Sequence, residues 1–190
     1  NCATGDMEFN VLDIVILAHC VLAENCGLVP DGSNAGEDFI ENGCAGDLNS
    51  DGGWNVLDSV ILANCILAEN CGGRVDDASG ASLIINENQL SIEGDGFIGG
   101  VQMTLTHGSD FSIEMTDRAL FADYLTTGNT TRLLVITPET EKLFGFKGNF
   151  EITDLIVANS QNEIPTSLPT IFSLSSAYPN PFNPVTRLSL

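Results

Sequence analysis

NVLDSVILANCILAENCG, residues 55–72, repeats the stretch NVLDIVILAHCVLAENCG, residues 10–27, with three differences in eighteen positions. The first 72 residues are therefore two copies of one unit. The Asn-Cys-Gly that closes each copy predicts a left-handed helix end, at Gly27 and at Gly72. In the second copy the apolar residues that fall on one stripe of a helix are Leu57, Ile61, Cys65 and Ala68. The first copy repeats this pattern with Leu12, Ile16, Cys20 and Ala23.

DLNSDGGWNVLD, residues 47–58, leads into the second helix and carries oxygen-bearing side chains at the spacing of a calcium loop. Calcium takes six to eight oxygen ligands, and an EF-hand loop supplies them from positions 1, 3, 5, 7, 9 and 12. A polar turn that only caps the helix is the alternative, but it needs Asp or Asn at one or two positions. We therefore expect calcium, with Gly52 at the sharp turn and these ligands: Asp47, Asn49, Asp51, the carbonyl of Gly53, Asn55 and Asp58.

Tandem D-x-N-x-D-G-x-x-N-x-x-D loops, each followed by one helix, resemble the dockerin type I module, whose twelfth ligand is Asp, as Asp58 is here. The resemblance covers residues 2–72 and implies a small all-α domain that docks to a partner. The first copy departs from the pattern because the stretch GDMEFNVLD is short. Its loop is expected to be either closed by a disulfide or a degenerate calcium site at Asp6, Asn10 and Asp13.

Six cysteines all lie within the first 71 residues, which indicates disulfides formed in an oxidising compartment. Each repeat holds three cysteines, so if all six pair, at least one bridge crosses between the repeats. Cys20 and Cys65 occupy equivalent positions on the two helical stripes, where a pseudo-twofold arrangement brings them together. Among fifteen connectivities, we predict Cys2–Cys26, Cys44–Cys71 and Cys20–Cys65.

After residue 73 the apolar pattern changes from helical to alternating, which predicts an antiparallel β-sandwich. The order of these segments resembles a short cohesin-like domain over about residues 80–165, the fold that receives dockerins. An immunoglobulin-like or carbohydrate-binding sandwich is the alternative. The expected strands are residues 82–86, 89–94, 97–107, 110–116, 131–137, 142–146 and 149–159.

The segment YPNPFNP, residues 178–184, resembles the start of the C-terminal sorting domain of type IX secretion substrates. The resemblance implies export across an outer membrane and retention at, or release from, the cell surface. The neighbouring segments TIFSL and VTRLSL alternate in polarity but are too short to form a sheet alone. A strand of this kind can add to the sheet edge of a neighbouring molecule.

Six basic residues stand against 26 acidic ones, which gives a net charge of −20. Such a field repels phosphate backbones and anionic membranes, so we expect neither nucleic-acid binding nor binding to a lipid surface. No apolar run reaches the roughly 18 residues that a membrane helix needs, so we expect no membrane insertion. The chain has two histidines, His19 and His107, and shows no G-x-S-x-G, phosphate-loop or dinucleotide motif. We therefore expect that it is not an enzyme.

Together these features predict an α+β multidomain protein: a small, disulfide-rich, all-α dockerin-like domain at 1–73, a β-sandwich at 80–163 and an extended tail at 164–190. The predicted function is a secreted, calcium-binding structural protein that self-assembles head to tail into an extracellular filament or surface layer, with copies of itself as partners. One alternative is an adhesion or scaffold-docking module that binds a separate cohesin-bearing partner or carbohydrate. Another is a monomeric surface spacer whose two modules pack against each other.

Overall fold

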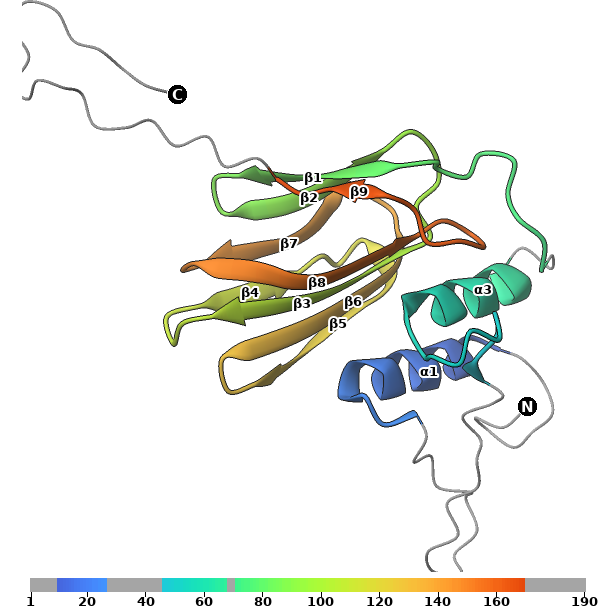
Figure 1. Ribbon diagram of the computed structural model, residues 1–190, viewed down its shortest axis with the longest axis horizontal. Coiled ribbons are helices and arrows are strands. Elements are labelled where there is room, and N and C mark those ends of the chain that lie inside the picture. The colour runs from blue at the N-terminus through green and yellow to red at the C-terminus, as the bar shows by residue number, and fades with distance from the viewer. Residues whose placement is uncertain (1–9, 27–45, 68–70, 170–190) are drawn as a thin grey trace, which may run out of the picture.

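The computed structural model describes residues 10–26, 46–67 and 71–169, and its fold is α+β (Figure 1). Two helices precede nine strands in this part of the chain. The helices are α1 (Val11–Ala23) and α3 (Val56–Leu67), at equivalent positions in the two repeats. The strands are β1 (Ala81–Asn86), β2 (Gln89–Gly94), β3 (Gly100–His107), β4 (Ser112–Met115), β5 (Ala119–Thr127), β6 (Thr130–Pro138), β7 (Lys142–Lys147), β8 (Phe150–Ala158) and β9 (Thr166–Ser167).

The strands form two sheets, one of five strands in the order β4-β7-β2-β1-β9 and one of four in the order β5-β6-β3-β8. Neighbouring strands are antiparallel except β1 and β9, which are parallel. Apolar side chains from both sheets fill the space between them because alternate residues of each strand point inward. The fully buried members include Leu90, Val101, Met103, Leu105, Leu133, Val135, Leu143 and Phe144.

All seven predicted strands are present, with shifts of a few residues at their ends. The prediction missed β5 and the two-residue strand β9. Residues 119–123 of β5 are all half-buried and residues 124–127 are exposed. The strand therefore lacks the alternation of buried and exposed side chains that is typical of a sheet with one face in solvent. The reason is that β5 lies under α1, which covers part of its outer side.

Both helices begin with the same pair of hydrogen bonds, which explains why the Asn-x-x-Asp spacing recurs. Asn10 and Asp13 form a capping box: the Asn10 side chain accepts the Leu12 N–H, and Asp13 accepts the Asn10 N–H at 2.8 Å. α1 ends at Glu24, whose φ of 53° is left-handed. The predicted left-handed end at Gly27 is therefore wrong in position, since the turn comes three residues earlier.

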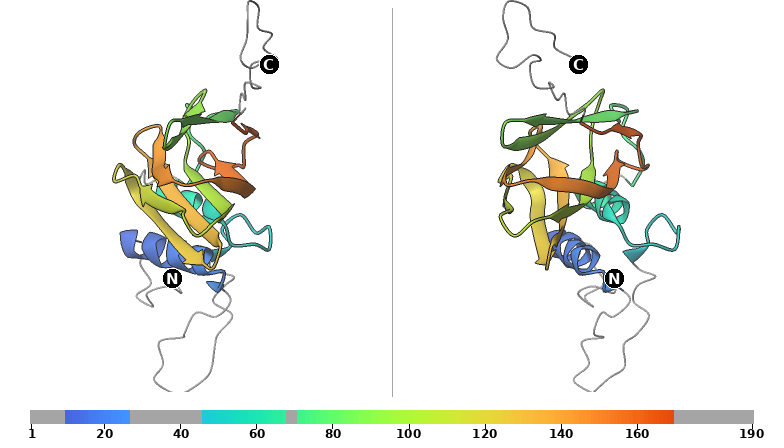
Figure 2. Two further views of the ribbon diagram at one scale, coloured as in Figure 1. Left: turned by 90° about the vertical axis from the view of Figure 1, so that its left-hand side faces the viewer. Right: turned by 60° about the vertical axis from the view of Figure 1, so that its left-hand side comes forward.

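The two helices pack side by side and cover the outer face of the four-stranded sheet (Figures 1 and 2). Helix side chains and outward-facing sheet side chains share one apolar cluster, which includes Ile14, Val56, Val60, Leu134 and Ile136. The five-stranded sheet lies on the far side of the sandwich (Figure 2). The two regions predicted as separate modules are thus in direct contact.

No helix among the described residues is long and apolar enough to span a membrane. The division into units at 1–73, 80–163 and 164–190 stays a prediction. The sorting-domain motif and most of the tail fall in residues 170–190, outside the described residues.

Candidate functional site

The contact between the helix pair and the four-stranded sheet, the helix–sheet interface, is the first candidate site. α3 approaches the sheet closely because β3 begins with glycine. A Cβ atom at Gly100 would lie 2.6 Å from Val56 Cγ2 and 2.7 Å from Val60 Cγ2. Val56 and Val60 are 0% and 1% exposed. Only a residue without a side chain leaves room for the helix at this point.

Polar side chains from the sheet reach one end of each helix. Gln102 on β3 is buried, and its Oε1 accepts the N–H of Val56 in the first turn of α3 at 3.0 Å. Arg132 on β6 donates to the carbonyl of Val21 in the last turn of α1 and pairs with Glu24. First-turn N–H groups such as that of Val56 have no partner within their own helix, whereas the Val21 carbonyl also accepts the N–H of Glu24 at 3.3 Å. These polar contacts therefore fix the direction and register of the helices on the sheet, in addition to the packing of their apolar faces.

An aromatic contact extends the interface to the edge strand. His19 of α1 lies edge-on to the ring of Phe121 of β5, with the ring centroids 5.4 Å apart. The other histidine, His107, has its Nε2 2.8 Å from the buried Thr131 hydroxyl. Each histidine thus has a packing or hydrogen-bonding role. The absence of an enzymatic activity stays a prediction.

The loop at residues 47–58 is the second candidate site. Its side-chain oxygens accept the loop's own backbone N–H groups. Asp47 accepts those of Asp51 and Gly52 at 3.1 and 3.0 Å. Asn49 accepts from Asp51, and Asp51 accepts from Gly53 at 2.8 Å. Gly52 has a φ of 87°, as expected at the sharp turn.

Asp58 connects the loop to α3. One carboxylate oxygen accepts the Leu48 N–H at 2.8 Å and the Asn49 N–H at 3.4 Å, and the other accepts the Asn55 N–H at 3.0 Å. The side chain is 0% exposed, and this burial raises its pKa above the ordinary value of 3.8, while the hydrogen bonds oppose the rise. Helix capping thus accounts for Asn55 and for part of Asp58.

The donor set of the loop has the chemistry that calcium prefers, because all six predicted ligands offer oxygen. The buried Asp58 carboxylate and the neighbouring charge of Asp47, which further raises its pKa, are groups that a cation would stabilise. Within residues 10–26, 46–67 and 71–169, no three His, Cys, Asp or Glu side chains form a group that could hold a metal ion. Calcium binding therefore stays a proposal, which rests on the oxygen-donor chemistry of the loop residues.

In the first repeat, Asn10 and Asp13 act together as the cap of α1. Asp13 is 2% exposed. Asp6, the other member of the predicted degenerate calcium site, lies outside the described residues.

The predicted disulfide pairing is wrong. The structure pairs Cys20 with Cys26 and Cys65 with Cys71, with Cα atoms 4.7 and 4.2 Å apart. Each bridge closes within its own repeat, between cysteines six residues apart in the chain. This arrangement excludes the predicted Cys2–Cys26, Cys44–Cys71 and Cys20–Cys65 pairs. Cys2 and Cys44 themselves lie outside the described residues.

The sequence interpretation missed the sheet residues of the interface, above all Gly100, Gln102 and Arg132. The Gly-Gly pair at the start of β3 was a usable signal, since glycine inside a strand marks a close approach. Gln102 and Arg132 gave no local signal, because their partners in the helices lie 46 and 111 residues away.

No protein-family model and no curated protein matches the chain. Among solved structures it is similar to a "Non-cellulosomal cohesin from the hyperthermophilic archaeon Archaeoglobus fulgidus", with 12% sequence identity and a TM-score of 0.36. The similarity covers 47% of this chain and 86% of that one. It concerns part of the fold and carries nothing about binding. The dockerin and sorting-domain resemblances stay predictions from the sequence.

Proposed function

We propose that the chain is a non-enzymatic, secreted structural module of the adhesion or scaffold class, whose helix pair is docked on its own β-sandwich and binds calcium through the second loop. One observation carries the proposal: α3 is seated over Gly100 with both valines buried, while Gln102 accepts the first-turn N–H of Val56. An interface with an apolar centre and specific polar contacts resembles a protein–protein recognition surface.

An extracellular location is supported by the two disulfides, because such bonds persist mainly in oxidising compartments. The net charge of −20 suits surroundings rich in divalent cations. Neither the disulfides nor the charge implies a catalytic residue, and the proposal assigns no catalytic residue to the chain.

Calcium would act on the interface through Asp58. The same carboxylate holds the loop at Leu48 and the helix start at Asn55, and the next residue, Val56, donates to the sheet. An ion that neutralises Asp47, Asp51 and Asp58 removes the repulsion among them and orders the loop. The loop, the start of α3 and the sheet would then be stabilised together.

The test is unfolding of the full chain in urea, in calcium and in EDTA. Calcium at a hundred times its dissociation constant should raise the free energy of unfolding by about 2.7 kcal/mol. The variant Asp51→Ala should lose most of this gain, because Asp51 binds only within the loop. The matched control Asp117→Ala, an exposed carboxylate on the sandwich, should keep it. Equal stability of the parent chain in calcium and EDTA would contradict the calcium site.

A second function, head-to-tail assembly, is favoured by the way the helices are joined to the sandwich. α3 ends at Leu67, and Cys71 is bridged back to Cys65. The chain then contacts the sandwich through the Cys71 carbonyl, which accepts from Gln161, and through the Arg74 N–H, which donates to Asp77 and Ser160. The helix pair contacts its own sheet without a disulfide to it among the described residues. If the pair moved to the sheet of a neighbouring copy, the same contacts would form between chains and propagate.

Negative-stain electron microscopy of the full chain in millimolar calcium and in excess EDTA tests this assembly. Filaments that shorten or vanish in EDTA are the expected result of exchange through a calcium-dependent helix pair. Single particles of uniform size in both solutions would rule out the exchange and leave the self-docked scaffold module.

A further inference from the structure

One edge of the five-stranded sheet is covered over only a third of its length. β9 pairs with β1 through Ala81–Thr166 and Ser82–Ser167 and then ends. The remaining part of β1, residues 83–86, pairs with β2 on one side. On its other side no strand lies within the described portion of the chain. We refer to residues 83–86 of β1 as the open edge.

The chemistry of the chain explains why β9 stops. The N–H of Ala81 donates to the carbonyl of Pro165 at 3.0 Å, so the backbone of Ala81 faces β9. Strand alternation makes the N–H and carbonyl groups of Leu83 and Ile85 face the same side. In the parallel register, the next N–H needed from β9 belongs to residue 169, which is proline and has none.

The open edge is apolar and lacks the usual protection of an edge strand. Ile84 is 37% exposed, Ile85 is 38% exposed, and Leu168 beside them is 56% exposed. The sequence Leu-Ile-Ile-Asn at residues 83–86 contains no charge and no proline. Natural edges normally carry such residues, because unpaired backbone groups beside apolar side chains invite another strand. This edge therefore has the composition of a receiving site.

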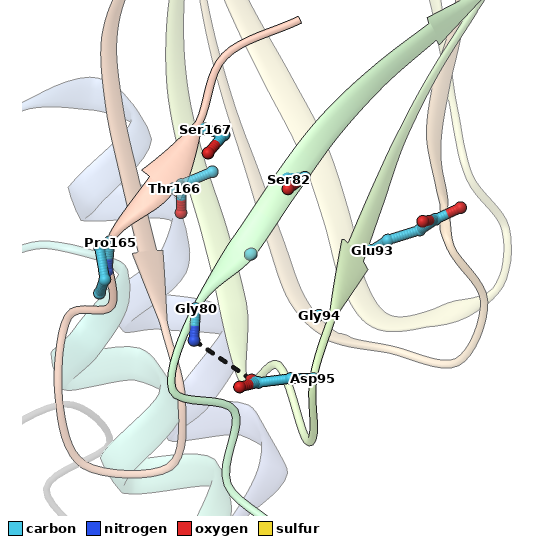
Figure 3. A pocket seen from close by; sticks show the side chains of 9 residues that line it. Gly80, Ser82, Glu93, Gly94, Asp95, Pro165, Thr166 and Ser167 are labelled. Atoms are coloured by element: carbon cyan, nitrogen blue, oxygen red, sulfur yellow. Dashed lines mark hydrogen bonds between the residues drawn. The ribbon is translucent and has the colours of Figure 1, made fainter.

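At the end of β1 that β9 covers, the surface is hollowed and carries the carboxylates of Glu93 and Asp95 (Figure 3). Asp95 is held within the turn, where its carboxylate accepts the N–H groups of Ser79 and Gly80. Glu93 points away from that turn, on the outer face of the sheet (Figure 3). It lies opposite Ser82 in the β1–β2 register. Glu93 therefore lies across β1 from the open edge, on the same outward face that an added strand would share.

The chain carries one segment whose charge and pattern complement this surface. From residue 164 to residue 190 there is no acidic residue, and Arg187 is the only charged side chain. The rest of the chain holds all 26 acidic residues. In the stretch Val-Thr-Arg-Leu-Ser-Leu, residues 185–190, Arg187 falls on one face of an extended strand and Leu188 with Leu190 on the other.

We propose that the open edge of β1 receives residues 185–190 of a second copy of this chain as an added strand. Leu188 and Leu190 would extend the inward face that already buries Leu83, and Arg187 would lie on the same outward face as Glu93, with β1 between them. The eighteen residue-to-residue steps from Ser167 to Val185 span about 60 Å when extended, which reaches a neighbouring molecule. Direct continuation of the same chain is stopped by Pro169.

The inference does not use the helix–sheet interface or calcium, so it can fail or hold independently of the proposed function. The sharpest variant is Ile85→Pro, which removes an N–H that faces the open edge and leaves the β1–β2 hydrogen bonds intact. Ile85→Val keeps both the donor and the branched side chain and is the matched control. Arg187→Glu reverses the complementary charge.

Sedimentation velocity of the full-length chains over a range of concentrations, in EDTA, measures the association. The parent and Ile85→Val should associate, and Ile85→Pro should weaken the association about tenfold or more, the equivalent of one or two lost hydrogen bonds. Arg187→Glu should weaken the association less than Ile85→Pro does. Added salt should reduce the difference in association between Arg187→Glu and the parent. Circular dichroism checks that Ile85→Pro retains the fold.

A parent chain that stays monomeric overturns the proposal, as does an Ile85→Pro chain that associates like the parent. Limited proteolysis separates the remaining case. If the parent is monomeric and Ile85→Pro makes the segment 170–190 more sensitive to protease, the open edge holds the chain's own tail, and the second copy is excluded.

Discussion

Adding one methyl group at Gly100 should lift α3 from the sheet. In Gly100→Ala the new Cβ would lie 2.6 Å from Val56 Cγ2, 2.7 Å from Val60 Cγ2 and 3.1 Å from the carbonyl oxygen of Val135. All three distances are shorter than an ordinary contact. Since the strand is held by β6 and β8 on both sides, the helix must move. Overpacking of this kind costs about 1–3 kcal/mol.

The partner substitution is Val60→Ala, which removes two methyl carbons from a side chain that is 1% exposed. The loss should be about 2 kcal/mol, from roughly 0.8 kcal/mol per buried carbon together with a small cavity term. If α3 is seated over Gly100, the smaller side chain at position 60 makes room for the methyl group at position 100. The double variant should then be more stable than the sum of the single losses by about 1 kcal/mol.

The assay is urea unfolding of the parent, the two single variants and the double variant, with a common slope. A second cycle, between Gly100→Ala and Leu12→Ala, is the control, since Leu12 is an apolar helix residue that is 55% exposed. This control cycle should be additive within about 0.5 kcal/mol. Additivity in the Gly100 and Val60 cycle as well would refute the seating of α3 on the first residue of β3.

Peptide mapping under non-reducing conditions should recover the Cys20–Cys26 and Cys65–Cys71 bridges; a Cys20–Cys65 peptide would contradict the structure. The pKa of Asp95 is lowered, mainly by its hydrogen bond from the Ser79 hydroxyl, so the stability it confers is present above the ordinary pKa of 3.8 and is lost as the pH falls below it. Unfolding curves of Asp95→Asn should therefore depend less on pH in that acidic range than those of the parent, and parallel curves would show that this contact is not formed.

The sequence was most informative where the contacts are local. The helical stripe predicted α3 because residues three and four apart share a face, and alternation predicted β2 within the same bounds that the structure shows. The N-terminal Asn-x-x-Asp spacing of both helices was noticed but assigned to metal ligands. In the structure Asn10 and Asp13 make a capping box, a role that the same residue types also support.

The missing parts depend on distant or three-dimensional features. The symmetry of the repeats suggested a Cys20–Cys65 bridge, whereas the left-handed Glu24 turns the chain so that Cys26 returns beside Cys20. Gln102 looked like an ordinary strand residue, and its acceptor role depends on a helix 46 residues earlier in the chain. Repeat symmetry describes what each unit contains, and the packing of the units decides which groups meet.

The parallel pairing of β1 with β9 has a mechanical consequence. Among the described residues β1 is the first strand of the sandwich and β9 the last, and the two strands run in the same direction. A pull between the start of β1 and the end of β9 loads their shared hydrogen bonds in shear, so that the bonds resist together. Antiparallel neighbours pulled from one shared end would instead open one bond after another. With two residue pairs in register, this clamp is short, and each added pair along β1 would raise the force that the sandwich withstands.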